Sequence, residues 1–307
     1  MNKQLIKVVV TGGAGFIGSH LVRQLLKEDY EVVVIDNLYS GKKENIPARA
    51  QFFNADIRNV KDIEPLFKNA KYVFHLAAIP SVQYSIENPA ETNDVNLDGT
   101  VSVLMAAKNA QVKRVVYSAS SAVYGDAEKL PITERESPKP KSPYALQKYA
   151  SELYAKLFSE MHGLETVNLR YFNVYGDGQP SVGAYASVIA KFLDLKKQNK
   201  KLTIVGDGNQ TRDFVHVSDV ARANIMAAKS NKVGRGESIN IGSGKKYSVK
   251  EIAKIIGGET EFLPPRIEPK DSLADISLAE SLLGWKPEIT LENGLKELLQ
   301  NIKKSLY

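Results

Sequence analysis

The sequence predicts an α/β protein with a doubly wound parallel sheet and a smaller mixed C-terminal part. Three observations carry this prediction: a glycine-rich turn within residues 11–18, an acid at the end of the next apolar run, and an alternation of apolar runs with amphipathic stretches. Apolar runs of this length are typical of parallel strands, and the amphipathic stretches between them are typical of crossover helices. Repeated strand–helix–strand units of this kind form a Rossmann-type sheet.

The glycine-rich turn follows a short β-branched run in KVVVTGGAGFIG, residues 7–18. Gly13, Gly15 and Gly18 have the G-x-G-x-x-G spacing, and Gly12 adds a second reading, Gly12-x-x-Gly15-x-x-Gly18. In such a turn one glycine makes the sharp bend, one admits a pyrophosphate close to the backbone, and one lets the helix pack on the strand. The phosphates would lie at the helix N-terminus, where unpaired N–H groups favour anions.

The acid is Asp36, which ends the apolar run at residues 32–35. A carboxylate about 20 residues beyond the glycines can accept hydrogen bonds from the hydroxyls of an adenosine ribose. It would repel a 2′-phosphate, so NAD is favoured over NADP. Lys42 and Lys43 lie close by in the sequence and weaken that preference.

The other elements are predicted from local patterns. A helix is expected from about Phe16 to Glu28, and residues 89–110 are expected to form one long helix, because their apolar positions mostly share a face. Residues 126–143 contain four prolines, so a long loop is expected there. A helix should follow, capped by Ser142. Further strands are expected at residues 32–36, 51–54, 71–75, 113–118 and 166–170.

Beyond residue 175 the alternation weakens. Ser218 and Asp219 are expected to open one of the later helices. The expected helices span residues 187–197, 217–230, 248–256 and 291–304, the strands 203–205 and 238–241, and the turns 176–183 and 206–209. We therefore expect a nucleotide-binding domain, residues 1–175, and a substrate-binding part, residues 176–307, with some chain crossing back into the first domain.

Composition narrows the function classes. The 307 residues are 43% hydrophobic and 25% charged, which is ordinary for a globular protein. The absence of cysteine excludes disulfides, thiolate ligands and a cysteine nucleophile, and the four histidines lack metal-ligand spacing, so no metal site is expected. No apolar run approaches the ~18 residues of a membrane span, and no signal peptide is apparent, so a cytoplasmic protein is expected.

The formal charge of +6 comes from lysines and arginines spread along the chain in short doublets. A nucleic-acid-binding tract with interleaved aromatic residues is not apparent, so no nucleic-acid partner is expected. A basic surface would still attract an anionic nucleotide substrate.

Two motifs predict acid–base chemistry. Tyr144 and Lys148 have a Tyr-x-x-x-Lys spacing that puts both side chains on one helix face, where an ammonium would favour the phenolate and make a base usable near neutral pH. The spacing alone also fits a packing tyrosine and a surface lysine. A serine cluster at residues 118–125 follows an apolar strand, and hydroxyls at the carboxyl end of a parallel strand face the ligand crevice. The combination favours an active site.

Eight segments, in matching order along nearly the whole chain, resemble the extended short-chain dehydrogenase/reductase family, and within it the UDP-hexose 4-epimerases. They are TGGAGFIGSH (11–20), IDNLYSG (35–41), HLAA (75–78), SASSAVYG (118–125), YALQK (144–148), RYFNVYG (170–176), TRDFVHVSD (211–219) and LADIS (273–277).

The resemblance implies tightly bound NAD. Asp36 is expected on the adenosine ribose, Asp56 near the adenine and Ala77 near the cofactor. Tyr144 would be the catalytic base, Lys148 would hold the nicotinamide ribose and lower the pKa of the tyrosine, and Ser120 would be its hydroxyl partner. The cofactor-binding residues implied are Gly12, Gly15, Phe16, Ile17, Gly18, Asp36, Asn37, Asp56, Ile57, Ala77 and Lys148.

The resemblance also implies a UDP-sugar substrate, oxidised at C4, rotated and reduced on its other face, and a homodimer formed through a helix pair. Ser272 stands where a bulky family side chain restricts the C2 substituent, so an acetamido group should fit. Ser81 and the stretch at residues 183–187 also resemble the branch that accepts N-acetylated sugars, and Pro80 stands where many glucose/galactose enzymes of the family have lysine. The substrate-binding residues implied are Ser81, Ser120, Tyr144, Asn173, Arg212, Arg266 and Ser272.

Three alternatives remain open at this point. A nucleotide-sugar dehydratase would need an acidic pair after the catalytic hydroxyl, where Ser121 and Ala122 stand. A decarboxylase, or an epimerase acting at another carbon, would share the tyrosine and the lysine. A non-catalytic relative that senses NAD or binds RNA is a third alternative, which the basic charge keeps open.

Overall fold

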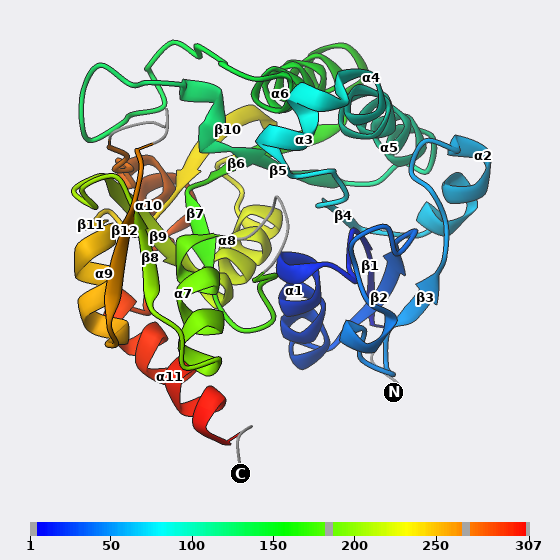
Figure 1. The fold of residues 1–307 in the computed structure, drawn as a ribbon. Coiled ribbons are helices and arrows are strands. Elements are labelled where there is room, and N and C mark those ends of the chain that lie inside the picture. Colours follow the sequence, from blue (N-terminus) through cyan, green and yellow to red (C-terminus); the bar gives the residue numbers. More distant parts are fainter. Residues whose placement is uncertain (1–4, 182–186, 266–270, 305–307) are drawn as a thin grey trace.

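The computed structural model describes residues 5–181, 187–265 and 271–304. Its centre is a sheet of seven parallel strands in the order β10-β6-β5-β4-β1-β2-β3 (Figure 1). The order reverses at β1, as in a doubly wound fold, so the predicted fold class is confirmed. The strands are β1 (Ile6–Thr11), β2 (Tyr30–Ile35), β3 (Gln51–Phe53), β4 (Tyr72–His75), β5 (Arg114–Ser120), β6 (Glu165–Tyr171) and β10 (Arg235–Ile241).

Helices cover both faces of this sheet. Side chains of β1 alternate between two cores: Val8 and Val10 pack with α1, whereas Val9 packs with α5 on the other face. In Figure 1, α3 to α6 lie above the sheet and α1 and α8 lie below it. These helices are α1 (Phe16–Lys27), α2 (Val60–Ile63), α3 (Val82–Glu87), α4 (Pro89–Asn93), α5 (Gly99–Asn109), α6 (Pro143–His162) and α8 (Val217–Lys229).

The remaining elements surround a separate apolar cluster that contains Phe192, Ile252 and Leu295. They form a three-stranded sheet, β11-β9-β7, and a parallel pair, β12-β8. Their bounds are β7 (Asn173–Tyr175), α7 (Val188–Lys197), β8 (Leu202–Val205), β9 (Thr211–His216), β11 (Lys246–Ser248), α9 (Val249–Ile256), β12 (Thr260–Leu263), α10 (Ser277–Leu283) and α11 (Leu291–Lys304). Because β10 is a strand of the large sheet and α8 packs against that sheet, the chain beyond residue 175 contributes to both parts. The division at residue 175 stays a prediction.

The structure differs from the sequence-based expectations at two helices. Residues 89–110 form α4 and α5 joined by a π-helical turn over Asp94–Asp98, instead of one regular helix. The helix at residues 217–230 is capped by the ring of His216, which accepts from the N–H of Ser218 at 3.3 Å, and not by Ser218 or Asp219. Asp219 is buried instead and accepts from the backbone of residues 288 and 289.

The proline-rich segment at residues 126–143 is a loop, as expected. It is attached to the segment after residue 271, because the N–H of Ile132 donates to Leu273 O at 2.7 Å and the N–H of Asp275 donates to Ile132 O at 2.9 Å. The helix α6 then begins at Pro143, and Ser142 Oγ accepts from the N–H of Ala145, which confirms the predicted cap.

Candidate active site

A pocket of about 610 Å³ opens at the carboxyl ends of the large sheet's strands, between that sheet and the smaller part. Ligands bind in this position in open α/β sheets. Most of the predicted site residues line it: Gly12, Gly15, Phe16, Ile17, Gly18, Asp36, Asn37, Asp56, Ile57, Ala77, Ser120, Tyr144, Lys148, Asn173, Arg212 and Ser272.

Two predicted substrate residues are not among these. Ser81 is 1% exposed, and its hydroxyl caps α3 by accepting from the N–H of Tyr84, while its neighbours Pro80 and Val82 line the pocket. The structure therefore does not bring Ser81 to the pocket wall, because a buried helix cap occupies its hydroxyl. Arg266, and residues 183–186 of the stretch singled out in the sequence, lie outside the described residues.

The glycine turn fits the second of the two predicted spacings. Gly12 has φ +73°, and a Cβ there would lie 2.6 Å from Ala77 N, while a Cβ on Gly18 would lie 2.1 Å from Gly12 O. Gly13 instead packs against Val34 and is not part of the pocket wall. Gly15 is the N-cap of α1 and has no side chain to cap the helix. The first turn of α1 therefore presents its N–H groups to the pocket.

The predicted ribose acid is almost completely buried. Asp36 Oδ2 accepts from the N–H of Ala14 at 3.0 Å and Oδ1 from the N–H of Leu38 at 2.8 Å. Burial raises the pKa of Asp36, and these two hydrogen bonds oppose the rise. Each oxygen retains a lone pair for a further donor, because a carboxylate offers about four acceptor positions. The turn and the acid together fit a dinucleotide.

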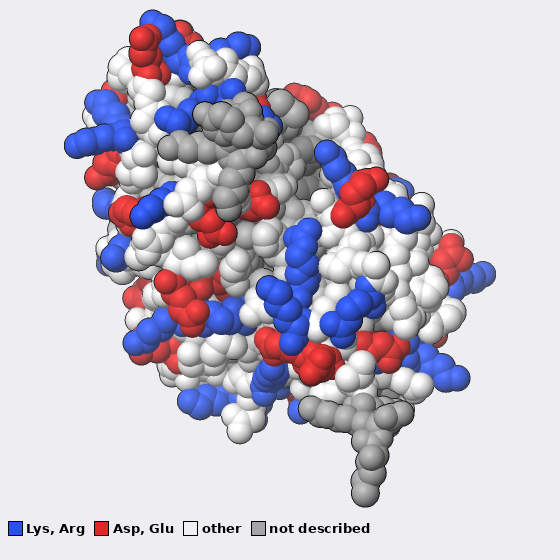
Figure 2. Space-filling view, turned by 90° about the horizontal axis from the view of Figure 1, so that it is seen from below, with Lys and Arg blue, Asp and Glu red and all other residues white. Residues whose placement is uncertain are grey.

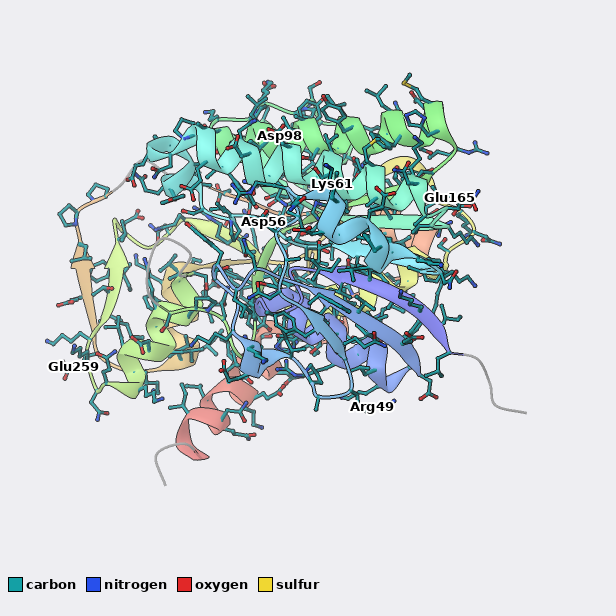
Figure 3. The ribbon with its side chains drawn as sticks, turned by 90° about the vertical axis from the view of Figure 1, so that its right-hand side faces the viewer. Arg49, Asp56, Lys61, Asp98, Glu165 and Glu259 are labelled. Carbon is teal, nitrogen blue, oxygen red and sulfur yellow. The ribbon has the colours of Figure 1, made fainter. Side chains whose placement is uncertain are left out.

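The predicted adenine end contains a further residue that the sequence motifs did not indicate. Arg58 lines the pocket and binds Asp56 through Nε at 3.0 Å and Nη2 at 2.7 Å, which lowers the pKa of Asp56 to about 2. Asn37 Nδ2 donates to the same carboxylate at 3.2 Å. Figure 3 shows Asp56 near the middle of the molecule, beside the ends of the strands. A basic residue two positions after an acid was the available signal for Arg58.

The three predicted catalytic residues meet at the end of β5. Lys148 is buried, and its Nζ donates to Ser118 O at 2.7 Å and lies 4.9 Å from the centroid of the Tyr117 ring. Burial lowers the pKa of Lys148 to about 7, and the charge of Glu152 opposes this decrease. Tyr144 lies one helical turn before Lys148.

The structure corrects the expected pKa of the tyrosine. Burial raises the pKa of Tyr144, and only its hydrogen bond with Ser120 lowers it. The expected decrease caused by Lys148 is therefore not found in the protein alone. The physical reason is that both groups are removed from water, which disfavours the phenolate and also the ammonium that should stabilise it.

A buried polar cluster supports the glycine turn from behind. His75 Nδ1 lies 2.7 Å from Thr11 Oγ1 and its Nε2 lies 2.9 Å from Thr100 Oγ1. Thr11 Oγ1 also accepts from the N–H of Ala77, which lines the pocket. Burial lowers the pKa of His75 to about 3, so this ring is neutral. His75 acts in packing and hydrogen bonding.

The smaller part supplies the opposite wall of the pocket. Asn173 Nδ2 donates to Asp213 O at 2.9 Å and lies 3.5 Å from Ser272 Oγ. Arg212 lines the pocket from β9, where its Nη1 donates to Thr211 O. The N–H of Ser272 donates to the same carbonyl at 3.1 Å. Asn173, Arg212 and Ser272, far apart in the sequence, are therefore neighbours.

The described residues contain no group of three or more His, Asp or Glu side chains that could hold a metal ion. Among the helices of the described ranges, none combines the length and apolar character that a membrane span requires. Figure 2 shows acidic and basic side chains interspersed on the face seen there.

The doubly wound sheet, the glycine turn and the buried acid define a dinucleotide-binding α/β protein. Residues 8–242 match the model of the NAD dependent epimerase/dehydratase family, and the chain belongs to this family. NAD is accordingly its cofactor, and the residues around the glycine turn fit it. Bound NAD supplies a hydride acceptor and donor.

Several relatives match the chain over almost its full length. A protein of Methanocaldococcus jannaschii, provisionally assigned as a UDP-glucose 4-epimerase, is 44% identical over 97% of this chain and 99% of its own. UDP-glucose 4-epimerase of Thermotoga maritima, solved with UDP-glucose, has a TM-score of 0.92 and 38% identity over 98% of this chain and all of its own. UDP-N-acetylglucosamine 4-epimerase of Methanobrevibacter ruminantium, solved with UDP-N-acetylmuramic acid, has a TM-score of 0.93 and 39% identity over 99% of this chain and all of its own.

Proposed function

We propose that the protein is a UDP-sugar 4-epimerase in which Tyr144 is the base. The observation that carries this proposal is that Tyr144, Ser120 and Lys148 meet in the same pocket as the glycine turn and Arg212. The pocket thus has the groups for a hydride-transfer cofactor at one end and for a nucleotide diphosphate at the other. The named relatives act on UDP-sugars, which supports the same substrate class.

In the proposed reaction, Tyr144 removes the proton of the C4 hydroxyl and Ser120 binds the C4 oxygen. Oxidation yields a 4-keto sugar, which turns about its link to the diphosphate. Tyr144 then returns its proton to the oxygen on the other face. This cycle requires tight contacts to UDP and weak contacts to the hexose, because tightly bound hexose would not rotate.

The raised pKa of Tyr144 requires positive charge nearby when the site is loaded. Lys148 is one source, because its ammonium stabilises a phenolate on the same helix face. An oxidised nicotinamide ring is another. In the proposed mechanism Lys148 also holds the nicotinamide ribose, while Asp36 binds the hydroxyls of the adenosine ribose.

Arg212, Asn173 and Ser272 are proposed to bind the UDP-sugar from the smaller part. A guanidinium group pairs with phosphate oxygens through two parallel hydrogen bonds, which suits Arg212 to the diphosphate. Ser272 adjoins Asn173 and is small, so the wall there leaves room for a C2 acetamido group. We therefore propose that UDP-GlcNAc and UDP-GalNAc are substrates in addition to UDP-Glc and UDP-Gal.

The experiment that tests the function is an NMR time course of the purified protein with UDP-GlcNAc and, separately, UDP-Glc, without added cofactor or metal. Appearance of the 4-epimers would establish epimerisation with retained NAD, and the ratio of the two rates would identify the preferred sugar. If neither epimer appears even after NAD is added, the 4-epimerase proposal fails. A product altered at another carbon, or one that has lost carbon dioxide, would favour the corresponding alternative.

We also propose that the protein forms a homodimer through α6. This helix exposes an apolar stripe with a spacing that keeps its members on one face. Met105 of the neighbouring α5 is 37% exposed and is part of the same helical layer. The stripe comprises Leu146, Leu153, Tyr154, Leu157 and Met161, of which Met161 is 71% exposed. A second copy of the same face would cover it, since an apolar stripe is self-complementary across a twofold axis.

A further inference from the structure

A buried ion pair lies next to the catalytic helix face and is not used by the proposed mechanism. Arg170 on β6 binds Glu152 on α6 through Nη2 at 2.6 Å and Nε at 3.0 Å. The two side chains are 5% and 3% exposed. Ser238 Oγ on β10 donates to the same carboxylate at 2.9 Å, so both oxygens of Glu152 are occupied. A pair this deeply buried contributes little net stability, because desolvation offsets the attraction between the charges.

Hydrogen bonds connect the ion pair to the segment that carries Ser120. Arg170 Nη1 donates to the hydroxyl of Tyr124 at 2.9 Å, and Tyr124 donates to Asn240 Oδ1 at 2.6 Å. Tyr124 ends the short helical turn that begins directly after Ser120. Any shift of Arg170 is therefore transmitted to the turn that Ser120, the hydroxyl partner of the tyrosine, caps at its start.

The network also reaches the loop at the pocket wall. Asn240 Nδ2 donates to Ile132 O at 2.9 Å, and the N–H of Asn240 donates to Glu134 Oε1 at 2.8 Å. Ile132 lines the pocket. The hydrogen bonds thus run without a gap from α6 through β6 and β10 to the loop, and each buried donor and acceptor is satisfied by a partner on another element.

Glu152 is also the charged neighbour of Lys148, one helical turn further along α6. Two other titratable side chains beside Lys148, His75 and Tyr117, are uncharged. Burial lowers the pKa of His75 to about 3 and raises the pKa of Tyr117 above its ordinary value. Glu152 therefore contributes the negative charge that favours the ammonium form of Lys148. The titratable groups beside Lys148 on the elements around it are Tyr144 and Glu152 on α6, Tyr117 on β5 and His75 on β4, and Arg170 on β6 binds Glu152.

We propose that the Glu152–Arg170 ion pair is a positioning device that holds Lys148 and the Ser120 turn in place around Tyr144. Neither residue lines the pocket. They act through Lys148 on one side and through Tyr124 on the other, and they touch no reacting atom. This inference rests on the proposed role of Tyr144 as the base, and it adds the reason why an ion pair is kept beside the site.

The test replaces Glu152 by glutamine, which keeps the shape of the side chain and removes its charge. The matched control is Glu165→Gln. Glu165 binds another arginine of the same sheet, Arg114, at 2.9 Å, but at the amino ends of β5 and β6, on the side away from the pocket. Figure 3 shows Glu165 at the edge of the molecule, far from Asp56. Each variant loses the carboxylate of one arginine–glutamate pair. Glu152 pairs α6 with β6, and Glu165 pairs β6 with β5.

Two measurements distinguish positioning from simple stabilisation. The first is the separation of kcat and KM for epimerisation, normalised to folded enzyme. The second is a pH titration of the tyrosinate absorbance in the protein without substrate. It is made for the wild type and each glutamine variant, and again after adding Tyr144→Phe to each of them. The difference between the two curves reports the ionisation of Tyr144 alone. We expect Glu152→Gln to lower kcat by roughly tenfold or more with little change in KM, because small displacements at a reacting centre are costly. We expect it also to raise the pKa of Tyr144, because a displaced Ser120 turn would lose the hydrogen bond that lowers this pKa in the protein without substrate.

Glu165→Gln should leave kcat and the titration of Tyr144 unchanged. The proposal is overturned if Glu152→Gln lowers thermal stability but keeps the wild-type kcat and tyrosine titration, since the pair would then be structural only. If Glu152→Gln does not fold, Tyr124→Phe replaces it, because that variant keeps both charges and removes only the hydroxyl that links Arg170 to Asn240. A wild-type kcat in Tyr124→Phe would then show that Arg170 does not position Ser120 through Tyr124.

The two proposals fail in different ways. If the wild-type protein epimerises neither UDP-sugar, the proposed function fails, and the tyrosinate titration still tests the positioning by itself. If the wild type is active and the Glu152→Gln variant is as active, the positioning fails and the function stands.

Discussion

The side-chain amide of Asn173 donates to the backbone oxygen of Asp213 at 2.9 Å, although 40 residues separate them in the chain. The carboxylate of the same aspartate accepts from the N–H of Ser243 at 2.6 Å, of Gly244 at 3.0 Å and of Ala274 at 3.0 Å. Asp213 therefore connects Asn173, residues 243–244 and Ala274, and of these Asn173 lines the pocket. It stands next to Arg212 in the segment TRDFVHVSD (211–219), but the sequence assigned a role only to the arginine.

Replacing Asp213 by asparagine should weaken substrate binding more than it affects chemistry. An amide nitrogen cannot accept from the N–H groups that now point at the carboxylate, and each unsatisfied donor costs about 1–3 kcal/mol. We expect KM for the UDP-sugar to rise roughly tenfold or more, at a small change in kcat, with a lower melting temperature. Steady-state kinetics and calorimetric titration with UDP would measure this. The control is Asp207→Asn in the exposed turn after β8, where kinetics should not change.

Replacing Tyr144 by phenylalanine should abolish turnover and retain the binding of NAD and UDP, because only the hydroxyl that moves the proton is lost. Activity is followed by NMR, and bound NAD by ultraviolet absorbance of the purified protein. Turnover close to wild type in this variant would contradict the role of Tyr144.

Replacing Ser272 by tyrosine should depress activity on UDP-GlcNAc selectively. Ser272 is next to Asn173, and a bulky ring there would occupy the space proposed for the acetamido group. The comparison is the ratio of kcat/KM for UDP-GlcNAc and UDP-Glc in the variant and in Ser272→Ala, which keeps the side chain small. An equal loss on both sugars would show that Ser272 does not select the C2 substituent.

The buried Lys148 makes stability depend on pH in a defined direction. Its pKa of about 7 in the folded protein lies below the value of about 10.4 in an unfolded chain, so between these values the unfolded state binds more protons. Its destabilising contribution is therefore complete below about pH 7 and is relieved as pH rises toward 10. Lys148→Met should raise the melting temperature most at pH 6 to 7, and the gain should shrink at higher pH.

Melting curves of the unliganded protein from pH 6 to 10 would measure this difference. The matched control is Lys156→Met on the same helix, whose side chain is 56% exposed and should show no such trend. A gain for Lys148→Met that is the same at every pH would mean that the lysine is not held with a lowered pKa.

Charging the exposed stripe of α6 should separate the proposed homodimer. Leu157→Glu buries a carboxylate in the interface of the dimer, but leaves it in water in the monomer, because Leu157 is 46% exposed in the isolated chain. Light scattering after size-exclusion chromatography should give the mass of one chain for this variant and of two for the wild type. Phe262→Glu on β12, an apolar site outside the stripe that is 58% exposed, should leave the mass unchanged. A wild-type mass of 33.9 kDa would contradict the homodimer itself.

The sequence by itself determined the large sheet and the part of the site that the large sheet carries. The strands β1, β2, β4 and β5 contain short apolar runs, and the glycine turn, Asp36 and the Tyr144–Lys148 spacing are local patterns whose geometry depends on a few consecutive residues. Local patterns of this kind are readable because strand, turn and helix impose fixed periods on the chain. The π-helical turn within residues 89–110 has no comparable period and was not predicted.

The tertiary structure alone decided which distant residues meet and what charge they carry. Strands as short as β7 and β11 have three residues each, too few to show an alternation, and they exist because they pair with β9. The side-chain hydrogen bonds of Asp213 join segments 30 to 61 residues apart, and the Glu152–Arg170 pair joins α6 to β6. The pKa of Tyr144 is raised because burial outweighs its hydrogen bond with Ser120. Desolvation depends on everything packed around a group, and a spacing of residues along the chain does not contain that information.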